Sequence, residues 1–332
     1  MPNQTPKASI IITTRNRPQL LTRAVQSAWA SSSNVEVVVV DDASSDETAD
    51  VCRGLFRINY VRLDRNRGVA GARNAGINLS RGDYLSFLDD DDVRLADSLD
   101  AQVEALENAP QAGLIYGQAI WGDQSGQPTD QIYPRVCAQG DVFWNLLEQN
   151  SIPSGSVVFR RSCLNRVGML DDSLPGIDYW DLWLRIAEVF PVIALEKPVM
   201  IWRRSNPASG QGTSSAADLV SQSVRQFRRS WLALPRAANA SQEMRRKAWR
   251  GFSVNIAEHL VWETMRAVQH GKVKDAIRNI FTLLRLCPAA TMRLASTRNL
   301  ARARGMITRQ ARAITPSYSG SINRPALHKD RA

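Results

Sequence analysis

Short apolar segments alternate with helical patterns in the N-terminal part of the chain, and this alternation constrains the fold more than any other feature. The apolar segments are rich in β-branched residues, as strands buried on both faces of a sheet are, and they lie at residues 9–13, 35–40, 59–63 and 84–88. Helical patterns fill the intervals, and the first opens at Pro18, where the missing N–H of proline costs nothing. Strands and helices in turn predict an α/β fold, a mostly parallel sheet wrapped by helices.

Polar clusters come directly after three of these strands. They are residues 13–17, the pair Asp41 and Asp42, and four consecutive aspartates at 89–92. In open α/β sheets ligands bind outside the carboxyl ends of the strands, so we expect the three clusters to meet in one site. The sequence contains neither a glycine-rich dinucleotide fingerprint nor a P-loop, so it predicts neither kind of nucleotide site.

The aspartates at 89–92 have two interpretations. Consecutive carboxylates at the end of a buried strand repel one another unless a cation binds, and carboxylate oxygens are the ligands that Mg²⁺ and Mn²⁺ prefer. A metal held by one or two carboxylates completes its shell with water and phosphate oxygens, which predicts a phosphate-bearing ligand. The alternative is a solvated acidic turn before a helix. Adjacent residues of an extended segment point to opposite sides, so not all four can reach one ion.

The composition is that of an ordinary globular protein. The 332 residues are 44% hydrophobic and 22% charged, which suits one large domain with an appendage. The cysteines have no C-x-x-C spacing, no apolar signal segment precedes the first strand, and no run approaches the ~18–20 apolar residues that span a bilayer. We therefore expect a reducing, cytoplasmic setting with neither a zinc site nor a transmembrane helix.

The charges divide the chain into two unlike parts. Through Trp202 there are 18 Lys and Arg against 26 Asp and Glu, whereas from Arg203 onward there are 24 against 6. An acidic first part suits metal-dependent chemistry, and a basic second part suits an anionic surface, either phospholipid or nucleic acid. Because the first part contains no nucleic-acid-binding motif, we expect no nucleic-acid partner.

The second half of the chain continues the α/β pattern and then changes character. Strand patterns occur at residues 114–117, 156–160, 192–195 and 199–202, and helical patterns at 176–185, 216–234, 244–270 and 273–286. The predicted organisation is an α/β domain at residues 1–206, a Gly-, Ser- and Pro-rich linker at 207–215, a basic helical region at 216–315 and a tail too poor in apolar residues to fold alone at 316–332.

Aromatic residues are interspersed among the arginines of the basic region. Trp231, Trp249, Trp262 and Phe281 lie on its helical segments. One interpretation is a peripheral membrane contact, in which the rings sit at headgroup depth and the cations meet anionic lipid. The other is a helical subdomain that packs its aromatic side chains on the α/β domain.

Ordered motifs over residues 8–205 resemble those of the family 2 glycosyltransferases, which have the GT-A fold. The matching segments are residues 10–17, 38–48, 66–76, 82–92, 156–161, 167–174 and 180–185. The resemblance implies an enzyme that transfers a sugar with inversion from a nucleoside diphosphate sugar, most often a UDP-sugar, and that uses Mn²⁺ or Mg²⁺. The acceptor would be a sugar, a lipid-linked saccharide or a polysaccharide, in the synthesis of a cell-surface polysaccharide or glycolipid.

The same resemblance assigns donor-binding residues. Asp42 would hold the base of the nucleotide, with Thr13 and Arg15 lining the same pocket. The loop on the diphosphate side would present Arg73 and Asn74, although for Arg73 a surface ion pair is an equal alternative.

The metal motif of the family, Asp-x-Asp, is matched by Asp89 and Asp91. By the resemblance, Asp91 would contact the metal directly. Asp89 or Asp90 would contact the ribose or a bound water.

The resemblance also assigns a catalytic base, with two departures from the family pattern. An inverting transfer needs a carboxylate that accepts the proton of the attacking hydroxyl. Asp178 is the first candidate and Asp181 the second, whereas Tyr179 replaces one carboxylate of the usual pair.

The second departure follows the last strand, where relatives place a histidine that completes the metal shell. Residues 202–206 contain none, so water, Ser205 or Asn206 would take its place.

Two other classes of protein compete with a glycosyltransferase. A nucleotidyltransferase would share the carboxylates and the metal, but its glycine-rich, cationic first loop is absent after Ile12. A non-catalytic sugar-nucleotide-binding or scaffold protein is favoured by the missing second acid beside Asp178.

Overall fold

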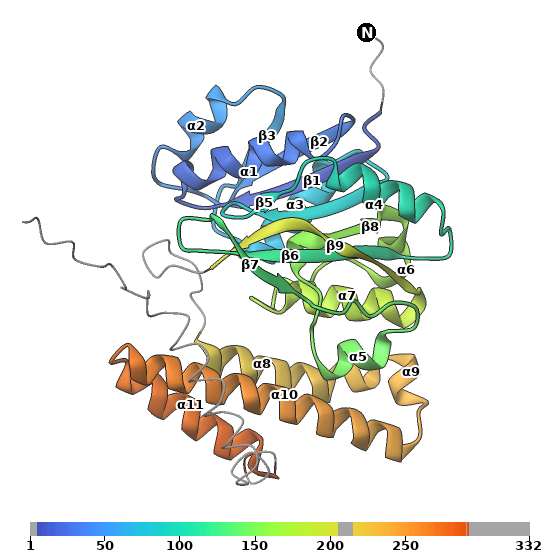
Figure 1. Ribbon diagram of the computed structural model, residues 1–332, viewed down its shortest axis with the longest axis vertical. Helices are drawn as coiled ribbons and strands as arrows, with labels where there is room; N and C mark the ends of the chain where they lie inside the picture. Colours follow the sequence, from blue (N-terminus) through green and yellow to red (C-terminus); the bar gives the residue numbers. More distant parts are fainter. Residues whose placement is uncertain (1–4, 205–214, 290, 292–332) are drawn as a thin grey trace, which may run out of the picture.

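The computed structural model describes residues 5–204, 215–289 and 291. Figure 1 shows a sheet flanked by helices, with a separate layer of helices against one side of it. The strands are β1 (Ala8–Thr14), β2 (Val35–Asp41), β3 (Ile58–Arg62), β4 (Tyr84–Asp89), β5 (Val93–Arg94), β6 (Leu114–Gly122), β7 (Pro128–Tyr133), β8 (Val157–Arg160) and β9 (Val192–Arg203). The helices are α1 (Pro18–Ala30), α2 (Thr48–Gly54), α3 (Gly68–Leu79), α4 (Ser98–Glu107), α5 (Phe143–Glu148), α6 (Leu164–Val167), α7 (Asp178–Val189), α8 (Ala216–Arg229), α9 (Pro235–Ala238), α10 (Gln242–Gln269) and α11 (Val273–Leu286).

The strands form one mixed sheet in the order β3-β2-β1-β4-β8-β6-β9-β5, and β7 pairs with β6 outside this path. The four strands at the β3 end are parallel, as the alternation of strands and helices predicts. Beyond this end the sheet is mixed. β4 pairs with β8 antiparallel, β8 pairs with β6 antiparallel, and β6 pairs with β9 parallel. The carboxyl ends of β1, β2 and β4 therefore meet at one edge of the sheet.

The side chains of β1 show how the sheet is buried on both faces. Ile11 packs in the same core as Ala72 of α3, whereas Ile10 and Ile12 pack with Leu21 of α1. Successive residues of a strand point to opposite faces, so a strand covered on both sides has to be apolar throughout. All three isoleucines are fully buried.

Several elements differ from the sequence prediction, among them α4, β7 and α5, which it did not include. β9 is one long strand where two short ones were expected, because the exposed pair Glu196 and Lys197 and then Pro198 interrupt its apolar pattern without ending the strand. β5 has only two residues, too few for any periodic pattern. α8 ends at Arg229, and the rest of the predicted helix forms a 3₁₀ turn followed by α9.

The helical region, α8–α11, packs on the α/β domain through α5 and α7 (Figure 1). Trp180 of α7 lies 4.7 Å from Trp231, between ring centroids, and Phe252 of α10 joins the same aromatic cluster. Of the predicted membrane aromatics, Trp231 is buried and Trp249 packs against this core, Trp262 is half-buried, and Phe281 is 64% exposed. Trp231 therefore packs between the two regions, whereas Trp249 packs on Phe227 and Phe252 within the helical region.

The predicted linker, apart from Ser215, and the predicted tail at 316–332 lie outside the described residues. Among the helices that the structure describes, none combines the length and the apolar content that crossing a bilayer requires.

Candidate active site

A cavity of about 340 Å³ lies at the carboxyl ends of β1, β2 and β4, and we refer to it as the strand-end cavity. Its volume lies within the range usual for small-ligand sites, about 300–1,000 Å³. Eight of the predicted site residues line it, namely Thr13, Arg15, Asp42, Arg73, Asp89, Asp90, Asp91 and Asp178. The predicted residues Asn74 and Asp181 are not among the lining residues.

The turns after β1 and β2 are fixed to each other by side-chain hydrogen bonds. The backbone N–H of Ser44 donates to Asp41 Oδ1 at 2.8 Å, and that of Ser45 donates to Asn16 Oδ1 at 2.8 Å. Asp42, 5% exposed, accepts a hydrogen bond from the backbone N–H of Arg67 at 2.6 Å. These bonds fix the turn that carries Asp42 beside the loop that carries Arg15.

The first two aspartates of the 89–92 cluster each have a cationic partner. Asp89 Oδ1 accepts from Arg73 Nη2 at 2.8 Å, and its side chain remains 39% exposed. Asp90 Oδ1 accepts from Arg17 Nη1 at 2.9 Å, while Asp90 Oδ2 accepts from the hydroxyl of Thr14 at 2.7 Å. Burial raises the pKa of Asp90 to about 7 despite the nearby Arg17.

The last two aspartates of the cluster both meet Arg203, the final residue of β9. Asp92 accepts from the backbone N–H of Arg203 at 2.9 Å, which is a structural role. Asp91 Oδ2 lies 3.5 Å from Arg203 Nη1, and both atoms are buried without a hydrogen-bond partner among the described residues. Burial, and next the charge of Asp89, raise the pKa of Asp91 to about 6. A buried carboxylate oxygen left without a donor is costly, and a bound cation would satisfy it.

Arg73 of α3 joins the metal motif to the candidate base. Its Nη1 donates to Asp178 Oδ2 at 2.9 Å, and its Nη2 donates to Asp89 Oδ1 at 2.8 Å. Arg73 is 3% exposed and lies between the rings of Phe87, 5.1 Å away, and Tyr179, 5.9 Å away. Burial alone would lower the pKa of Arg73, but the two carboxylates outweigh burial and raise it. The ion pair of Arg73 is thus a buried one at the cavity and not on the outer surface.

Asp178 and Asp181 point in different directions although both lie in the first turn of α7. Burial raises the pKa of Asp178, and the charge of Arg73 opposes this shift. Asp181 accepts three hydrogen bonds at the interface with the helical region, from Arg185 Nε, Gln226 Nε2 and Trp231 Nε1 at 2.8, 3.0 and 2.8 Å. The geometry therefore gives Asp181 a structural role.

Asn74 also has a structural role. Its Nδ2 donates to the carbonyl of Leu170 and to Asp172 Oδ1, and its Oδ1 accepts from the N–H of Leu170. This side chain fixes the loop before α7 and does not face the cavity, so the predicted contact of Asn74 with a diphosphate is not supported by the geometry.

Several site residues had no predicted role. Thr14 and Arg17 lie within the first polar cluster and contact Asp90, whereas Tyr179 and Gly176 line the cavity from the start of α7. Only their proximity to the assigned motifs could have indicated them. Arg203 is 112 positions from Asp91, and no local pattern links the two.

The mixed sheet with its flanking helices has the GT-A fold, the fold of a class of glycosyltransferases. Two solved structures have a similar fold. The S. aureus TarS 1-349 complex with UDP-GlcNAc aligns with a TM-score of 0.58 at 15% identity, over 85% of this chain and 82% of that one. The mannosyltransferase PcManGT from Pyrobaculum calidifontis, in complex with GDP-Man and Mn²⁺, aligns with a TM-score of 0.53 at 18% identity, over 96% of this chain and 83% of that one.

Within this class, residues 9–168 match the model of the family "Glycosyl transferase family 2". Among curated relatives, the succinoglycan biosynthesis proteins ExoU and ExoO of Rhizobium meliloti (strain 1021) are 45% identical over 193 residues and 38% identical over 110 residues. The match covers 53% of this chain and 55% of ExoU, and 32% of each chain for ExoO. Residues 9–168 thus match glycosyltransferase family 2, and the chain spans about a third to a half of the length of these two relatives.

Proposed function

We propose that this protein transfers a sugar from a nucleoside diphosphate sugar to an acceptor hydroxyl with inversion at the anomeric carbon. The observation that carries the proposal is the buried Arg73, which holds Asp178 and Asp89 on its two amino groups inside one cavity. This arrangement puts the candidate base beside the motif that would hold the leaving diphosphate. Base and leaving group have to flank the same sugar, so the two functions belong in one cavity.

The donor is proposed to be a UDP-sugar whose base lies between the turns after β1 and β2. Asp42 is a suitable acceptor for the N–H of a uracil, and the hydroxyl of Thr13 is a suitable donor to a uracil carbonyl. Arg15, exposed at the cavity, would meet the phosphates or the ribose. The structural relatives were solved with UDP-GlcNAc and with GDP-Man, so the fold accommodates more than one base.

The residues at the cavity fit a divalent cation that binds together with the donor. Among the described residues no group of three or more His, Cys, Asp or Glu side chains is placed to hold a metal by itself. Mg²⁺ or Mn²⁺ in nucleotide enzymes needs only one or two carboxylates, because phosphates and water supply the other oxygens. Asp91, whose Oδ2 accepts no hydrogen bond among the described residues, would hold the ion, and Asp89 is the second candidate. Such an ion neutralises the charge that develops on the leaving diphosphate.

In the proposed reaction Asp178 accepts the proton of the acceptor hydroxyl. The hydroxyl oxygen bonds to the anomeric carbon, the bond from that carbon to the diphosphate breaks, and the nucleoside diphosphate leaves with the electron pair. Arg73 keeps Asp178 ionised and fixes its direction, while burial makes the carboxylate more basic than an aspartate in water. The phenol of Tyr179 has its pKa raised to about 12, by burial and then by Asp178, so it cannot serve as a second carboxylate.

The acceptor is proposed to be a growing polysaccharide or a lipid-linked saccharide handled on the cytoplasmic side of the membrane. Support comes from the names of the two Rhizobium relatives, which are succinoglycan biosynthesis proteins. A second candidate function is a sugar-nucleotide-binding scaffold. It is favoured by Tyr179, which stands where relatives have a second acid, and by the ion pair that partly neutralises Asp178.

The test begins with donor binding. A panel of sugar nucleotides is screened by thermal shift with and without Mn²⁺, for the wild type and for Asp91→Asn. We expect a UDP-sugar to raise the melting temperature in Mn²⁺ and Asp91→Asn to abolish the metal-dependent part of the shift. Asp83→Asn is the matched control, because Asp83 is exposed just before β4, at the end of that strand away from the cavity. Equal shifts in Mn²⁺ and in EDTA would contradict the metal role of Asp91.

Turnover separates the two candidate functions. The wild type is incubated with the donor found in the screen and with saccharide acceptors, and released nucleoside diphosphate is measured. A transferase releases it in an acceptor-dependent manner, with inverted anomeric configuration in the product, whereas a scaffold binds the donor and releases none.

A further inference from the structure

Helix α11 exposes five large apolar side chains, whereas Leu283 is the one large apolar side chain among its buried residues. The buried residues of the helix are Ala276, Asn279, Thr282 and Leu283. The exposed apolar residues are Val273 (62%), Ile277 (62%), Ile280 (46%), Phe281 (64%) and Leu284 (56%). A helix that packs only on its own domain has the opposite arrangement, with the apolar stripe inward and polar residues in water.

The exposed apolar residues form one continuous surface, which we call the α11 face. At 3.6 residues per turn, their spacing puts all five on a stripe about 100° wide along the helix. Basic residues border this stripe on one side. They are Lys274, Arg278 and Arg285, all exposed, with Arg278 also paired to Asp218 of α8.

We propose that the α11 face binds the surface of an anionic phospholipid bilayer, with the helix lying in the plane of the interface. Apolar side chains in a stripe beside cations are the composition of helices that insert a few ångströms into the headgroup region. The inference goes beyond the proposed reaction and does not rest on it, because it concerns a surface on the helical region. It also differs from the expectation drawn from the tryptophans, since Trp231 and Trp249 pack inside the protein.

Charge complementarity favours a bilayer over the other possible occupants. A second copy of the chain would bring a second set of cations to the border of the stripe, and five side chains are far fewer than the roughly 20–30 residues per side of a stable protein interface. Residues 292–332 of the same chain contain nine Lys and Arg and one Asp, so they too would meet like charge at this border. Anionic headgroups, in contrast, neutralise the cations that border the α11 face and those of residues 292–332.

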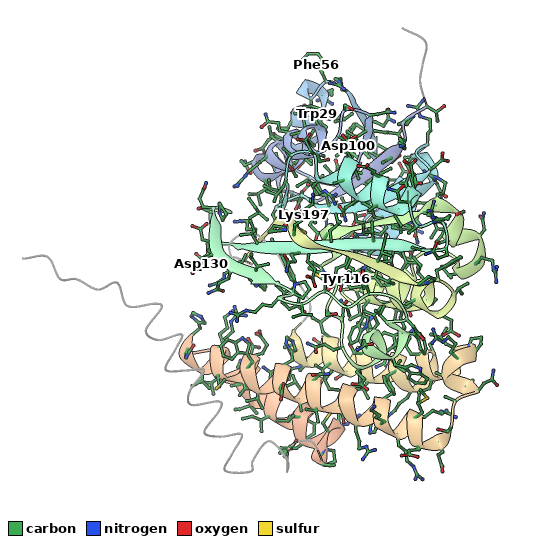
Figure 2. All side chains as sticks on the ribbon, turned by 45° about the vertical axis from the view of Figure 1, so that its right-hand side comes forward. Trp29, Phe56, Asp100, Tyr116, Asp130 and Lys197 are labelled. Atoms are coloured by element: carbon green, nitrogen blue, oxygen red, sulfur yellow. The ribbon has the colours of Figure 1, made fainter. Side chains whose placement is uncertain are left out.

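The experiment is co-sedimentation of the full chain with vesicles of phosphatidylcholine alone or mixed with phosphatidylglycerol, at low and at high salt. The test variant is Ile277→Gln with Phe281→Gln, which keeps helix-compatible residues and removes two exposed apolar side chains. The matched control is Phe56→Gln, because Phe56 is 82% exposed and lies at the opposite end of the molecule from α11 (Figures 1 and 2). Melting temperature and donor-induced thermal shift are recorded for each variant to show that the fold is retained.

We expect the wild type and Phe56→Gln to bind the anionic vesicles at low salt, with weaker binding at high salt and to neutral vesicles. The double variant should lose binding by about ten-fold or more, because each buried apolar side chain contributes to partitioning. The proposal is overturned if the double variant binds as the wild type does, or if Phe56→Gln loses as much. It is also overturned if sedimentation velocity shows a wild-type dimer that the double variant lacks, or if deletion of residues 292–332 is needed before any vesicle binding is seen.

Discussion

The two sides of α7 use the same chemical groups for different purposes. Toward the strand-end cavity, Asp178 has one ion-pair partner, Arg73, which it shares with Asp89. Toward the helical region, Asp181 receives three donors and is closed off by Trp231. A carboxylate saturated with donors stabilises the fold but is a poor base, whereas one held beside a cavity keeps the capacity to accept a proton. The helical region therefore supports the wall of the cavity, and none of its described residues lines it.

Substitution of the two carboxylates of α7 is expected to have the largest effect, on the rate for Asp178 and on stability for Asp181. Asp178→Asn should reduce kcat by ~10²–10⁴, the usual contribution of a positioned general base, and leave donor affinity within a few-fold of the wild type. Asp181→Asn is the matched variant, and it should mainly lower stability. The measurements are initial rates of acceptor-dependent nucleoside diphosphate release and donor titration. If Asp181→Asn loses the rate and Asp178→Asn does not, the two roles have to be exchanged.

The pH dependence of the rate tests whether Asp178 is the base. Asp178 works as a base only when ionised, so kcat/KM, which reports the pKa of the free enzyme, falls as the pH decreases through that pKa. Because burial raises this pKa, the acidic limb of the profile should have its midpoint above ~3.9, the value of an unperturbed aspartate. A rate that stays constant down to that pH in the wild type would exclude Asp178 as the base.

Loss of one hydrogen bond at the interface between α7 and the helical region is expected to have an intermediate effect, on stability. Trp231→Phe keeps most of the aromatic packing but removes the hydrogen bond to Asp181, so it should lower the free energy of unfolding by about 1–3 kcal/mol. Trp29→Phe is the control, since Trp29 Nε1 is buried without a hydrogen-bond partner among the described residues. Urea unfolding of the two variants measures the difference. Equal losses would show that the bond to Asp181 contributes nothing.

An alanine at Gly176, where the rim of the cavity contacts α8, is expected to have the smallest effect, a small difference in stability from an alanine at Gly140. Gly176 and Gly140 both have φ of +83°, so an alanine at either position carries the same backbone penalty, about 1 kcal/mol. A Cβ at Gly176 would also lie 2.6 Å from Leu219 Cδ2, whereas Gly140 has nothing within 4 Å.

We therefore expect Gly176→Ala to be less stable than Gly140→Ala by about 1 kcal/mol or less, because the end of the leucine side chain can move. Adding Leu219→Ala to each variant should remove the difference. A difference that persists in the double variants would place its cause elsewhere than in the contact with α8.

The alternation of strands with helices and the polar clusters at the strand ends determine the parallel half of the sheet and the place of the site. These features are local, since periodicity and turn chemistry are set by neighbouring residues. For this reason eight of the ten predicted site residues line a single cavity in the structure. Their individual roles remain predictions.

Only the tertiary structure decides which member of each set of similar residues faces the cavity. The sequence offers both Asp178 and Asp181 as the base, and Trp231, 50 positions beyond Asp181, gives Asp181 its structural role. In the same way Arg203 reaches Asp91 from the far end of the α/β domain. Trp231 and Trp249 of the basic region pack against the core, while Val273, Ile277, Ile280 and Leu284 of α11 remain exposed. A local pattern specifies that a helix has an apolar face, but the partner that covers the face is supplied by residues distant in the chain, or by a surface outside it.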